Sequence, residues 1–472
     1  MNVQRIVNWS RRHPVIAGIL AFPVIVILLF LLWNGYTYFR LYSEVRTLER
    51  MGISCEVGNL SERQQELGAS EELTREFLAL CDEISTKDFP QASPRSLRTA
   101  QLEEEDLPKF LAEHAEELRA VDRFLDEHPD LILLYDDSTA PRWLGQLSML
   151  NPLREVGRLN YDRFYSALSR NDPAGAVRIF DRSAILRDYA LRGSSSVSYL
   201  ISSAIEATRE ESLFQAAQYS EIGLFDTETL QRWCGSMSDV ETAFRSGFER
   251  MLKYELGRMA GYGFQPRQFY RTESAVSEQA GRWMGWIFAP LFRLDAAAAA
   301  RNVREIALPV AALDYTPETA RKLQLLHDFQ ESRDKRGVVW APISLSLLPD
   351  VLLNESVSRM YARFRLLRTG LAVELFLRKY GRLPEQLNEL VPEFLPAVPV
   401  NPFTGKPLQI EAGTLEYYRS LTETIETFKG YRIYLDGAPE ARPVGLTRTD
   451  RNGRIPVWNR AMKLSGGGEG KA

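Results

Sequence analysis

The chain has 472 residues, of which 45% are hydrophobic and 25% are charged, so it can fold into roughly two or three domains with real cores and is not a disordered chain. Its formal net charge of −4 is close to balance, which gives a nucleic-acid partner no electrostatic support. The three cysteines and four histidines form neither a CxxC nor an HExxH motif, so we expect no zinc ribbon, dense disulfide framework or transition-metal site. Cys55 and Cys81 either form a disulfide or remain buried thiols, and the sequence leaves both alternatives open.

An apolar run, PVIAGILAFPVIVILLFLLW, extends from Pro14 to Trp33. No charged side chain occurs within it or in the six residues that follow. At about 1.5 Å per residue the run is long enough for a helix to cross a hydrocarbon layer roughly 30 Å thick. Pro23 lies inside the run, where a membrane helix tolerates proline, and Trp33 and Tyr36 begin an aromatic group typical of a membrane–water interface. We therefore predict a transmembrane anchor with its interface belt over residues 14–39.

The residues on either side of this run predict its orientation and its fate. Residues 1–13 contain Arg5, Arg11 and Arg12 and no acidic side chain, which favours a cytoplasmic N-terminus by the positive-inside rule. A cleaved signal peptide is the alternative, but such a peptide has a shorter apolar core that ends in a small-x-small site, and none follows Trp33. We expect an uncleaved, single-pass anchor in the inner (cytoplasmic) membrane, in contact with the lipid bilayer, and a periplasmic or otherwise extracytoplasmic ectodomain.

Hydrophobic periodicity and capping residues predict a mainly α ectodomain over residues 40–353. The anchor helix is expected to continue to about Arg50, and Ser70 is expected to cap a helix that ends near residue 84. Further amphipathic helices are expected over 106–127, 152–169, 173–192, 195–219, 226–234 and 243–259, the last opened by a capping box at Ser238 and Glu241. Short connections between them indicate antiparallel neighbours, hence a multi-helix bundle or stacked helical hairpins.

Two uncharged stretches interrupt the later part of this region, at residues 283–292 (WMGWIFAPLF) and 337–349 (GVVWAPISLSLLP). Both are too short to span a bilayer. Each is either a core segment of the helical domain or a surface that dips into the membrane interface.

A small α+β module is expected at the C-terminal end, over residues 354–462. It begins with an amphipathic helix that is capped by Asn354 and ends at Gly381. Pro384 then starts a short helix, and residues 408–410 and 415–418 are expected to pair as a hairpin. Residues 463–472 are rich in glycine and are expected to form a disordered tail.

A turn motif in this module carries a resemblance to a known family. Asn401, Pro402 and Gly405 have the residue types of a tight turn. With the preceding text, YGRLPEQLNELVPEFLPAVPVNPFTG, the segment 354–420 resembles the region after the long helix in major pseudopilins of type II secretion. The chain is also similar over most of its length to a group of single-pass, membrane-anchored bacterial proteins with a helical middle and this ending, a resemblance that implies no known activity.

Two departures limit what the pseudopilin resemblance implies. Pseudopilins have a glutamate in the apolar stretch shortly after a prepilin cleavage site, and the run Pro14–Trp33 contains none. We therefore do not expect the chain to be processed or polymerised as a pilin. The family turn has aspartate where this chain has Asn401, and no convincing match to the family's calcium loop follows, so we expect no bound calcium.

Glu206 and Glu255 are the candidates for catalysis, because both lie in predicted helices beside apolar residues. Two inward carboxylates on packed helices can hold a metal ion or act as acid and base. The alternative is that each carboxylate pairs with a nearby arginine. The sequence has neither a nucleophile elbow nor a Gly-rich phosphate loop, and we expect no cofactor.

These patterns together predict a membrane-anchored envelope protein that acts as a non-enzymatic scaffold for protein partners, for example in a secretion or pilus-like system. The alternative is an envelope hydrolase or transferase whose carboxylate pair, Glu206 and Glu255, lies within roughly 10 Å in a pocket of the bundle. The identity of the partners and the oligomeric state are not predicted by the sequence.

Overall fold

The computed structural model describes residues 14–55, 64–85, 106–135, 142–218, 221–265, 288–308, 355–402, 404–419, 424–435 and 455–461, with five single positions between 321 and 335. Two compact units are formed from interleaved parts of the chain. The first unit contains residues 1–57, 254–305 and 330–348, and the second contains residues 58–253, 306–329 and 349–472. The predicted tails, 1–13 and 463–472, and the apolar stretch 337–349 lie outside the described residues.

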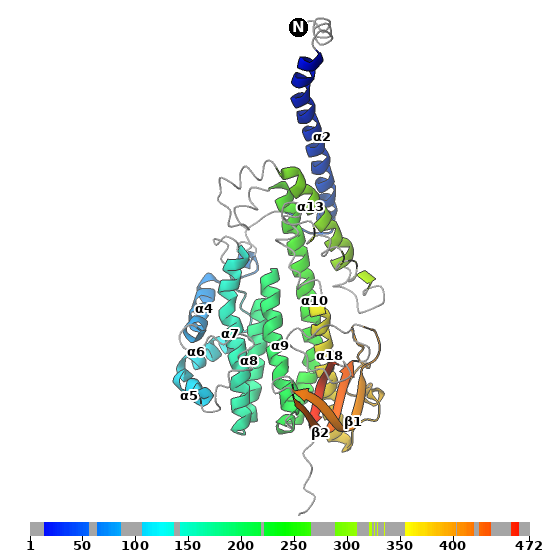
Figure 1. Ribbon diagram of the computed structural model, residues 1–472. Coiled ribbons are helices and arrows are strands. Elements are labelled where there is room, and N and C mark those ends of the chain that lie inside the picture. The colour runs from blue at the N-terminus through cyan, green and yellow to red at the C-terminus, as the bar shows by residue number, and fades with distance from the viewer. Residues whose placement is uncertain are drawn as a thin grey trace, which may run out of the picture. The chain divides into compact units, whose positions relative to one another are not determined.

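The first unit is built on α2 (Pro14–Arg50), which continues without interruption to Arg50 as predicted. α13 (Ala289–Asn302) packs along the C-terminal half of α2, as Figure 1 shows, and is followed by a π-helical turn, η2 (Val303–Ala307). Residues 254–264, the end of α10 (Thr227–Phe264), complete this unit. Gly263 of α10 lies so close to α2 and α13 that a Cβ atom there would overlap Leu41 and Ala296.

The second unit consists of a series of packed helices followed by a small sheet, which confirms the predicted fold class. Its described helices are α4 (Glu71–Ser85), α5 (Asp106–Glu113), α6 (Ala115–Glu127), α7 (Arg142–Ser169), α8 (Pro173–Leu191), α9 (Ser196–Gln218), η1 (Glu221–Leu224), the first part of α10, α18 (Glu355–Tyr380) and η3 (Leu387–Leu390). α7, α8 and α9 pack on one another, α4 contacts α6 and α7, and α18 contacts α9. Short loops join α7 to α8 and α8 to α9, so these neighbours are antiparallel.

Local capping residues begin several of these helices where the sequence predicts. The Ser70 hydroxyl accepts a hydrogen bond from the backbone N–H of Leu73, 3.2 Å away, at the start of α4. Asp172 caps α8 by accepting from the N–H of Gly175 at 2.8 Å, and Pro173 occupies the first helical position. Both bonds satisfy N–H groups that a helix terminus leaves without an internal partner.

Three helix boundaries differ from the sequence prediction. α7 begins at Arg142 and contains Pro152, which was expected to start a helix. Leu150 and Leu153 beside it are completely buried, and this burial outweighs the roughly 3 kcal/mol that an internal proline costs. The single helix expected over 106–127 is interrupted at His114, between α5 and α6.

α10 is one helix of 38 residues, where two helices with a break near Ser238 were expected. The capping box does not form, because the Glu241 side chain instead pairs with Arg245 at 2.7 Å and with Arg365 of α18 at 2.9 Å. Val240 and Phe244 are buried on either side of this position. The apolar face therefore passes through the predicted break and keeps the helix continuous.

The sheet has the strand order β1-β2-β3 and is antiparallel. β1 (Gln409–Arg419) pairs with β2 (Thr424–Leu435), and β2 pairs with β3 (Ile455–Ala461). The expectation that residues 408–410 and 415–418 form a hairpin was wrong, because residues 410 and 415 to 418 belong to the same strand and their partners lie in β2. The single Gly413 between them, at φ +142°, does not end the strand.

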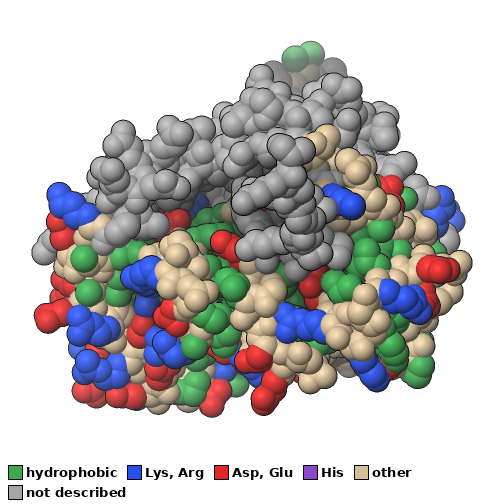
Figure 2. Space-filling model, turned by 90° about the horizontal axis from the view of Figure 1, so that it is seen from below, with side chains coloured by type: hydrophobic (Ala, Val, Ile, Leu, Met, Phe, Trp, Pro, Cys, Tyr) green, Lys and Arg blue, Asp and Glu red, His purple; other side chains and the backbone are tan. Residues whose placement is uncertain are grey.

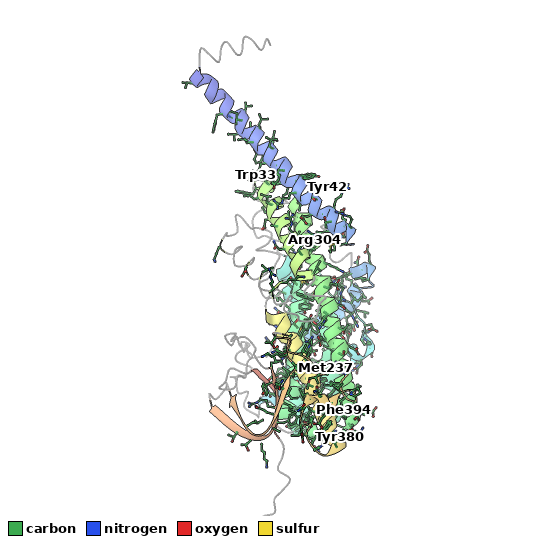
Figure 3. The ribbon with its side chains drawn as sticks, turned by 90° about the vertical axis from the view of Figure 1, so that its right-hand side faces the viewer. Trp33, Tyr42, Met237, Arg304, Tyr380 and Phe394 are labelled. Carbon is green, nitrogen blue, oxygen red and sulfur yellow. The ribbon has the colours of Figure 1, made fainter. Side chains whose placement is uncertain are left out.

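One face of this sheet packs on α18. Tyr431, Ile433 and Leu435 point to one face of β2 and are buried. Arg432, on the opposite face, is buried as well and pairs with Glu411 of β1 at 3.3 Å. The Tyr431 hydroxyl donates a 2.6 Å hydrogen bond to Glu374 of α18. At the end of α18, the rings of Tyr380 and Phe394 lie 6.5 Å apart (Figure 3).

Acidic and basic side chains are interspersed over the described part of the face shown in Figure 2. Apolar side chains appear between them in small groups. This mixture is typical of a solvated protein surface.

Candidate membrane anchor and buried charge networks

α2 divides into two halves of opposite character. From Phe22 to Trp33 every side chain except that of Phe30 is exposed, and the exposed fraction of Leu28 is 54%. From Thr37 onward one side of the helix is buried, and Leu41 and Leu48 are completely buried. Among the described helices α2 is long and apolar enough to cross a membrane, a test that an N-terminal signal sequence also meets. Pro14 begins the helix and Pro23 lies inside it without ending it.

Aromatic side chains follow the exposed apolar half. Trp33, Tyr36, Tyr38 and Phe39 are exposed, Phe39 at 71%, and Tyr42 lies one turn further along the helix. Two of the tyrosines pair with arginines four residues later. Arg40 donates a 3.0 Å hydrogen bond to the Tyr36 hydroxyl, and Arg46 donates one of 2.8 Å to the Tyr42 hydroxyl. We call Trp33, Tyr36, Tyr38, Phe39 and Tyr42 the aromatic belt; Figure 3 labels Trp33 and Tyr42.

Arginines attach α13 to the polar positions of α2. Arg293 donates a hydrogen bond to Asn34 and lies over the ring of Tyr38, 5.5 Å from its centroid. Six residues beyond Tyr38, the buried Glu44 forms ion pairs with Arg301 at 2.6 Å and with Arg304 at 3.1 Å. The low exposure of Glu44 makes these pairs costly to break, because removal of the arginines would leave a buried charge without compensation.

Sequence reasoning missed these contacts, although two signals for them are present. Arg293, Arg301 and Arg304 recur at spacings that place them on one side of a helix. Glu44 interrupts the apolar face made by Leu41, Val45 and Leu48. A lone acidic residue on an apolar helix face requires a cationic partner from another element.

Glu206, the first candidate catalytic carboxylate, is completely buried in α9 and is held by two arginines. Its Oε2 atom accepts from Arg187 of α8 at 2.9 Å, and its Oε1 atom accepts from Arg209 at 2.6 Å. Burial alone would raise the pKa of Glu206, but the charges of Arg209 and Arg187 outweigh it and keep the pKa below its usual range. Glu206 is therefore ionised and occupied at both oxygens.

A second buried carboxylate lies one turn later in α9. The Oε2 atom of Glu210 accepts a 2.6 Å hydrogen bond from Arg363 of α18, which also donates to the carbonyl oxygen of Ala207 at 3.1 Å. The Oε1 atom of Glu210 is buried and has no hydrogen-bond partner among the described residues. Burial raises the pKa of Glu210 to about 7, against the opposing effect of the Arg363 charge. Sequence reasoning missed this residue, because the sequence does not show which polar positions of α9 are covered by α18.

Glu255, the second candidate catalytic carboxylate, belongs to the first unit, whereas Glu206 belongs to the second. Its side chain is buried in α10, and its Oε2 atom lies 3.6 Å from Arg258. Each candidate thus has an arginine partner within its own unit, the arrangement expected of ion pairs that join or brace helices. Proton transfer by Glu206 would require it to leave two charge-assisted hydrogen bonds.

The turn motif in the C-terminal module is organised by Asn401. Its carbonyl oxygen accepts a hydrogen bond from the N–H of Gly405 at 2.8 Å, and its own N–H donates one to the carbonyl oxygen of Lys406 at 2.7 Å. Gly405 has φ +70°, the left-handed conformation that favours glycine, and Pro402 occupies the position after Asn401. Arg365 of α18 donates to the carbonyl oxygen of Val400 at 2.9 Å and so fixes the turn beside the helix.

The cysteines are free thiols in this structure. Cys55 lies in the first unit and Cys81 in the second. Burial, followed by the nearby charge of Glu49, raises the pKa of Cys55 to about 11, so its thiol is protonated and unreactive at neutral pH. Within the described residues no group of three or more histidine, cysteine, aspartate or glutamate side chains has the arrangement of a metal site.

Comparison with known proteins gives no relative for this chain: neither a protein-family model, nor a curated protein sequence, nor a solved structure matches it significantly.

Proposed function

We propose that this protein is a single-pass, uncleaved anchor protein of the inner membrane whose helical ectodomain serves as a scaffold for protein partners. The observation that supports the anchor is the division of α2 into an exposed apolar half and a half that is packed into the first unit. A hydrophobic surface that surrounds a helix on all sides is stable when lipid covers it.

The packing of α2 also favours an anchor over a signal sequence. The helix continues through the belt without a break, and Asn34 and Glu44 bind α13 through Arg293, Arg301 and Arg304. Cleavage near residue 35 would separate Asn34 from Arg293 and would remove the belt's first residue. Cleavage further along would remove buried residues of the first unit's core. Because cleavage would remove contacts on which the first unit depends, the packing of α2 supports its retention.

The scaffold role is supported by the way in which the buried charges are used. The Arg187–Glu206–Arg209 cluster joins α8 to α9, and the Glu210–Arg363 pair joins α9 to α18. These bonds brace helices and bring the C-terminal module against the helical part of the second unit. We propose that this module and the ectodomain surface contact partners in the envelope, outside the cytoplasm, with residues 1–13 inside.

Retention in the membrane and recovery of partners test the two parts of this proposal in one preparation. Membranes that contain the full-length protein are washed at alkaline pH, which releases peripheral proteins, and are then solubilised for affinity purification. We expect the protein to remain with the washed membranes and to recover the same partners in repeated preparations. The double variant Leu28→Arg/Leu29→Arg should be released, because an arginine inside the hydrocarbon layer costs up to about 3 kcal/mol.

The matched control is Leu67→Arg, at an exposed leucine of the second unit, which should be retained like the unchanged protein. Release of the unchanged protein by the wash would contradict the anchor. A bait that carries residues 1–39 on an unrelated soluble protein is the control for the purification. If the full-length protein is retained but recovers no reproducible partner beyond those of this bait, the scaffold role is contradicted and the anchor is not.

A further inference from the structure

α13 runs parallel to the C-terminal half of α2, in a register that its contacts define. Arg293, near its start, contacts Asn34 and Tyr38, whereas Arg301 near its end contacts Glu44. Ten residues separate Asn34 from Glu44 and eight separate Arg293 from Arg301, which correspond to about 15 Å and 12 Å of helix. Each residue of α13 therefore lies at the same height as the residue of α2 whose number is about 258 lower.

This register places the first turn of α13 at the level of the aromatic belt. Leu291 is level with about Trp33, and Leu294 is level with about Tyr36. Trp33 ends the apolar run of α2, which is 20 residues and therefore about 30 Å long. The beginning of α13 thus lies where a membrane that contains the run of α2 would meet water.

The outward side of α13 changes from apolar to polar along its length. Leu291, Leu294 and Ala298 follow one another at helical spacing and are half-buried or exposed, whereas Phe292 and Ala296 on the opposite side are buried. The outward side ends with Asn302, which lies four residues after Ala298 and is polar and half-buried. The apolar part is level with the belt and the polar part lies beyond it, so the change occurs at the depth where a bilayer surface requires it.

We propose that the first two turns of α13 are a second membrane-contacting element, with Leu291 and Leu294 in the interfacial layer of the lipid beside the aromatic belt. The proposal rests on α2 being the anchor. Arg293 contributes to this position, because its guanidinium lies between Asn34 and Tyr38 at the same level, where a cation reaches the headgroup layer. The occupant of this surface is the phospholipid bilayer.

Depth-dependent fluorescence quenching tests the proposal with the full-length protein in lipid vesicles. An environment-sensitive dye is attached to cysteines introduced by Leu28→Cys, Leu291→Cys and Asn302→Cys, and the dye signal of the unchanged chain is subtracted for its three native cysteines. Phosphatidylcholine with a nitroxide near the headgroup, or deep in the acyl chain, is the quencher. We expect loss of fluorescence at Leu291→Cys with the shallow quencher, and none at Asn302→Cys, which lies about 16 Å further along the same helix.

The Leu28→Cys position separates the two proposals. It should lose fluorescence with the deep quencher, and failure to do so would overturn the anchor itself. If the dye is quenched at Leu28→Cys but is unquenched to the same extent at Leu291→Cys and Asn302→Cys, the membrane contact of α13 is overturned. The anchor is then unaffected. Leu294→Cys supplies the same comparison if a label at position 291 disturbs the fold, which circular dichroism would reveal.

Discussion

Two glutamates one turn apart in α9 show how burial and charge set opposite protonation states. Both Glu206 and Glu210 are almost completely buried. Two arginines bind Glu206 and lower its pKa, whereas the pKa of Glu210 rises to about 7 because burial outweighs its single arginine partner. The ionised Glu206 therefore stabilises the folded state at pH values above its ordinary pKa of 4.5. This contribution is lost as the pH falls through the lower pKa of the folded state. Glu210 has the opposite dependence.

Replacement of Glu210 by glutamine should change the pH dependence of stability. Between pH 4.5 and about 7 the folded state holds a proton on Glu210 that the unfolded state has released, so stability falls as the pH rises through this window. Glutamine copies the neutral carboxyl group and keeps an acceptor for Arg363. We expect Glu210→Gln to match the unchanged protein near pH 4 and to be more stable at pH 8, by about 3 kcal/mol at most.

Denaturant unfolding of the solubilised protein across this pH range measures the effect. Asp162, whose pKa burial also raises to about 7, is present in both proteins, so the difference between the two curves isolates Glu210. Glu228→Gln, at an exposed position in the first turn of α10, is the control for the loss of one carboxylate. Equal curves for Glu210→Gln and the unchanged protein would show that the proton is not held there.

At the scale of elements, α10 contains two glycines with opposite expectations. Gly257 lies against the carbonyl oxygen of Ser54, and a Cβ atom would overlap it, whereas a Cβ built at Gly235 would have no described atom within 4 Å beyond its chain neighbours and the backbone of its own helical turns. Alanine normally stabilises a helix interior by up to about 1 kcal/mol relative to glycine. The close approach of the chain after α2 should reverse this effect at Gly257.

Gly257→Ala should therefore destabilise the first unit by about 1–3 kcal/mol, because the backbone at Ser54 must move. Gly235→Ala on the same helix should be neutral or stabilising by up to about 1 kcal/mol. Thermal unfolding of both variants of the full-length protein measures the difference. If Gly257→Ala were as stable as Gly235→Ala, the contact with Ser54 would not exist in solution.

Helix existence could be predicted from local sequence, but helix continuity could not. Ser70, a predicted cap, and Asp172, just before the predicted helix 173–192, are caps whose effect depends on the next three residues alone. Pro152 and Ser238 also have the residue types of helix starts, yet both lie inside helices. Burial of neighbouring apolar side chains against other helices decided these two cases, and the sequence does not identify the residues that provide this burial.

At the scale of the whole molecule, the predicted topology places all described residues after the belt outside the cytoplasm. In right-side-out spheroplasts of a bacterial host, we expect added protease to degrade the ectodomain, because Arg5, Arg11 and Arg12 favour a cytoplasmic N-terminus. An antibody to a tag at the C-terminus follows the loss of the full-length band. A cytoplasmic marker protein must stay intact as the control. If the ectodomain were protected to the same extent as this marker, the predicted orientation would be wrong.

The division into two units could not be predicted from the sequence. Residues 40–353 were predicted as one helical region, and they contribute to both units, because α10 passes from the second unit into the first at about Tyr254. A continuous amphipathic helix gives no sign of where its packing partners change. The same limit applies to Glu206 and Glu255, which the sequence presents as a pair and which belong to different units.

The sequence by itself determined the features that depend on residues close together in the chain. These include the apolar helix α2, the mainly helical fold, the caps of α4 and α8, and the residue types of the turn at Asn401. Hydrophobic length and local hydrogen bonds set them. Only the tertiary structure decided which charges meet: Glu44 with Arg301 across 257 residues, and Glu210 with Arg363 across 153. Buried charges require partners, but the fold selects those partners through the packing of distant helices.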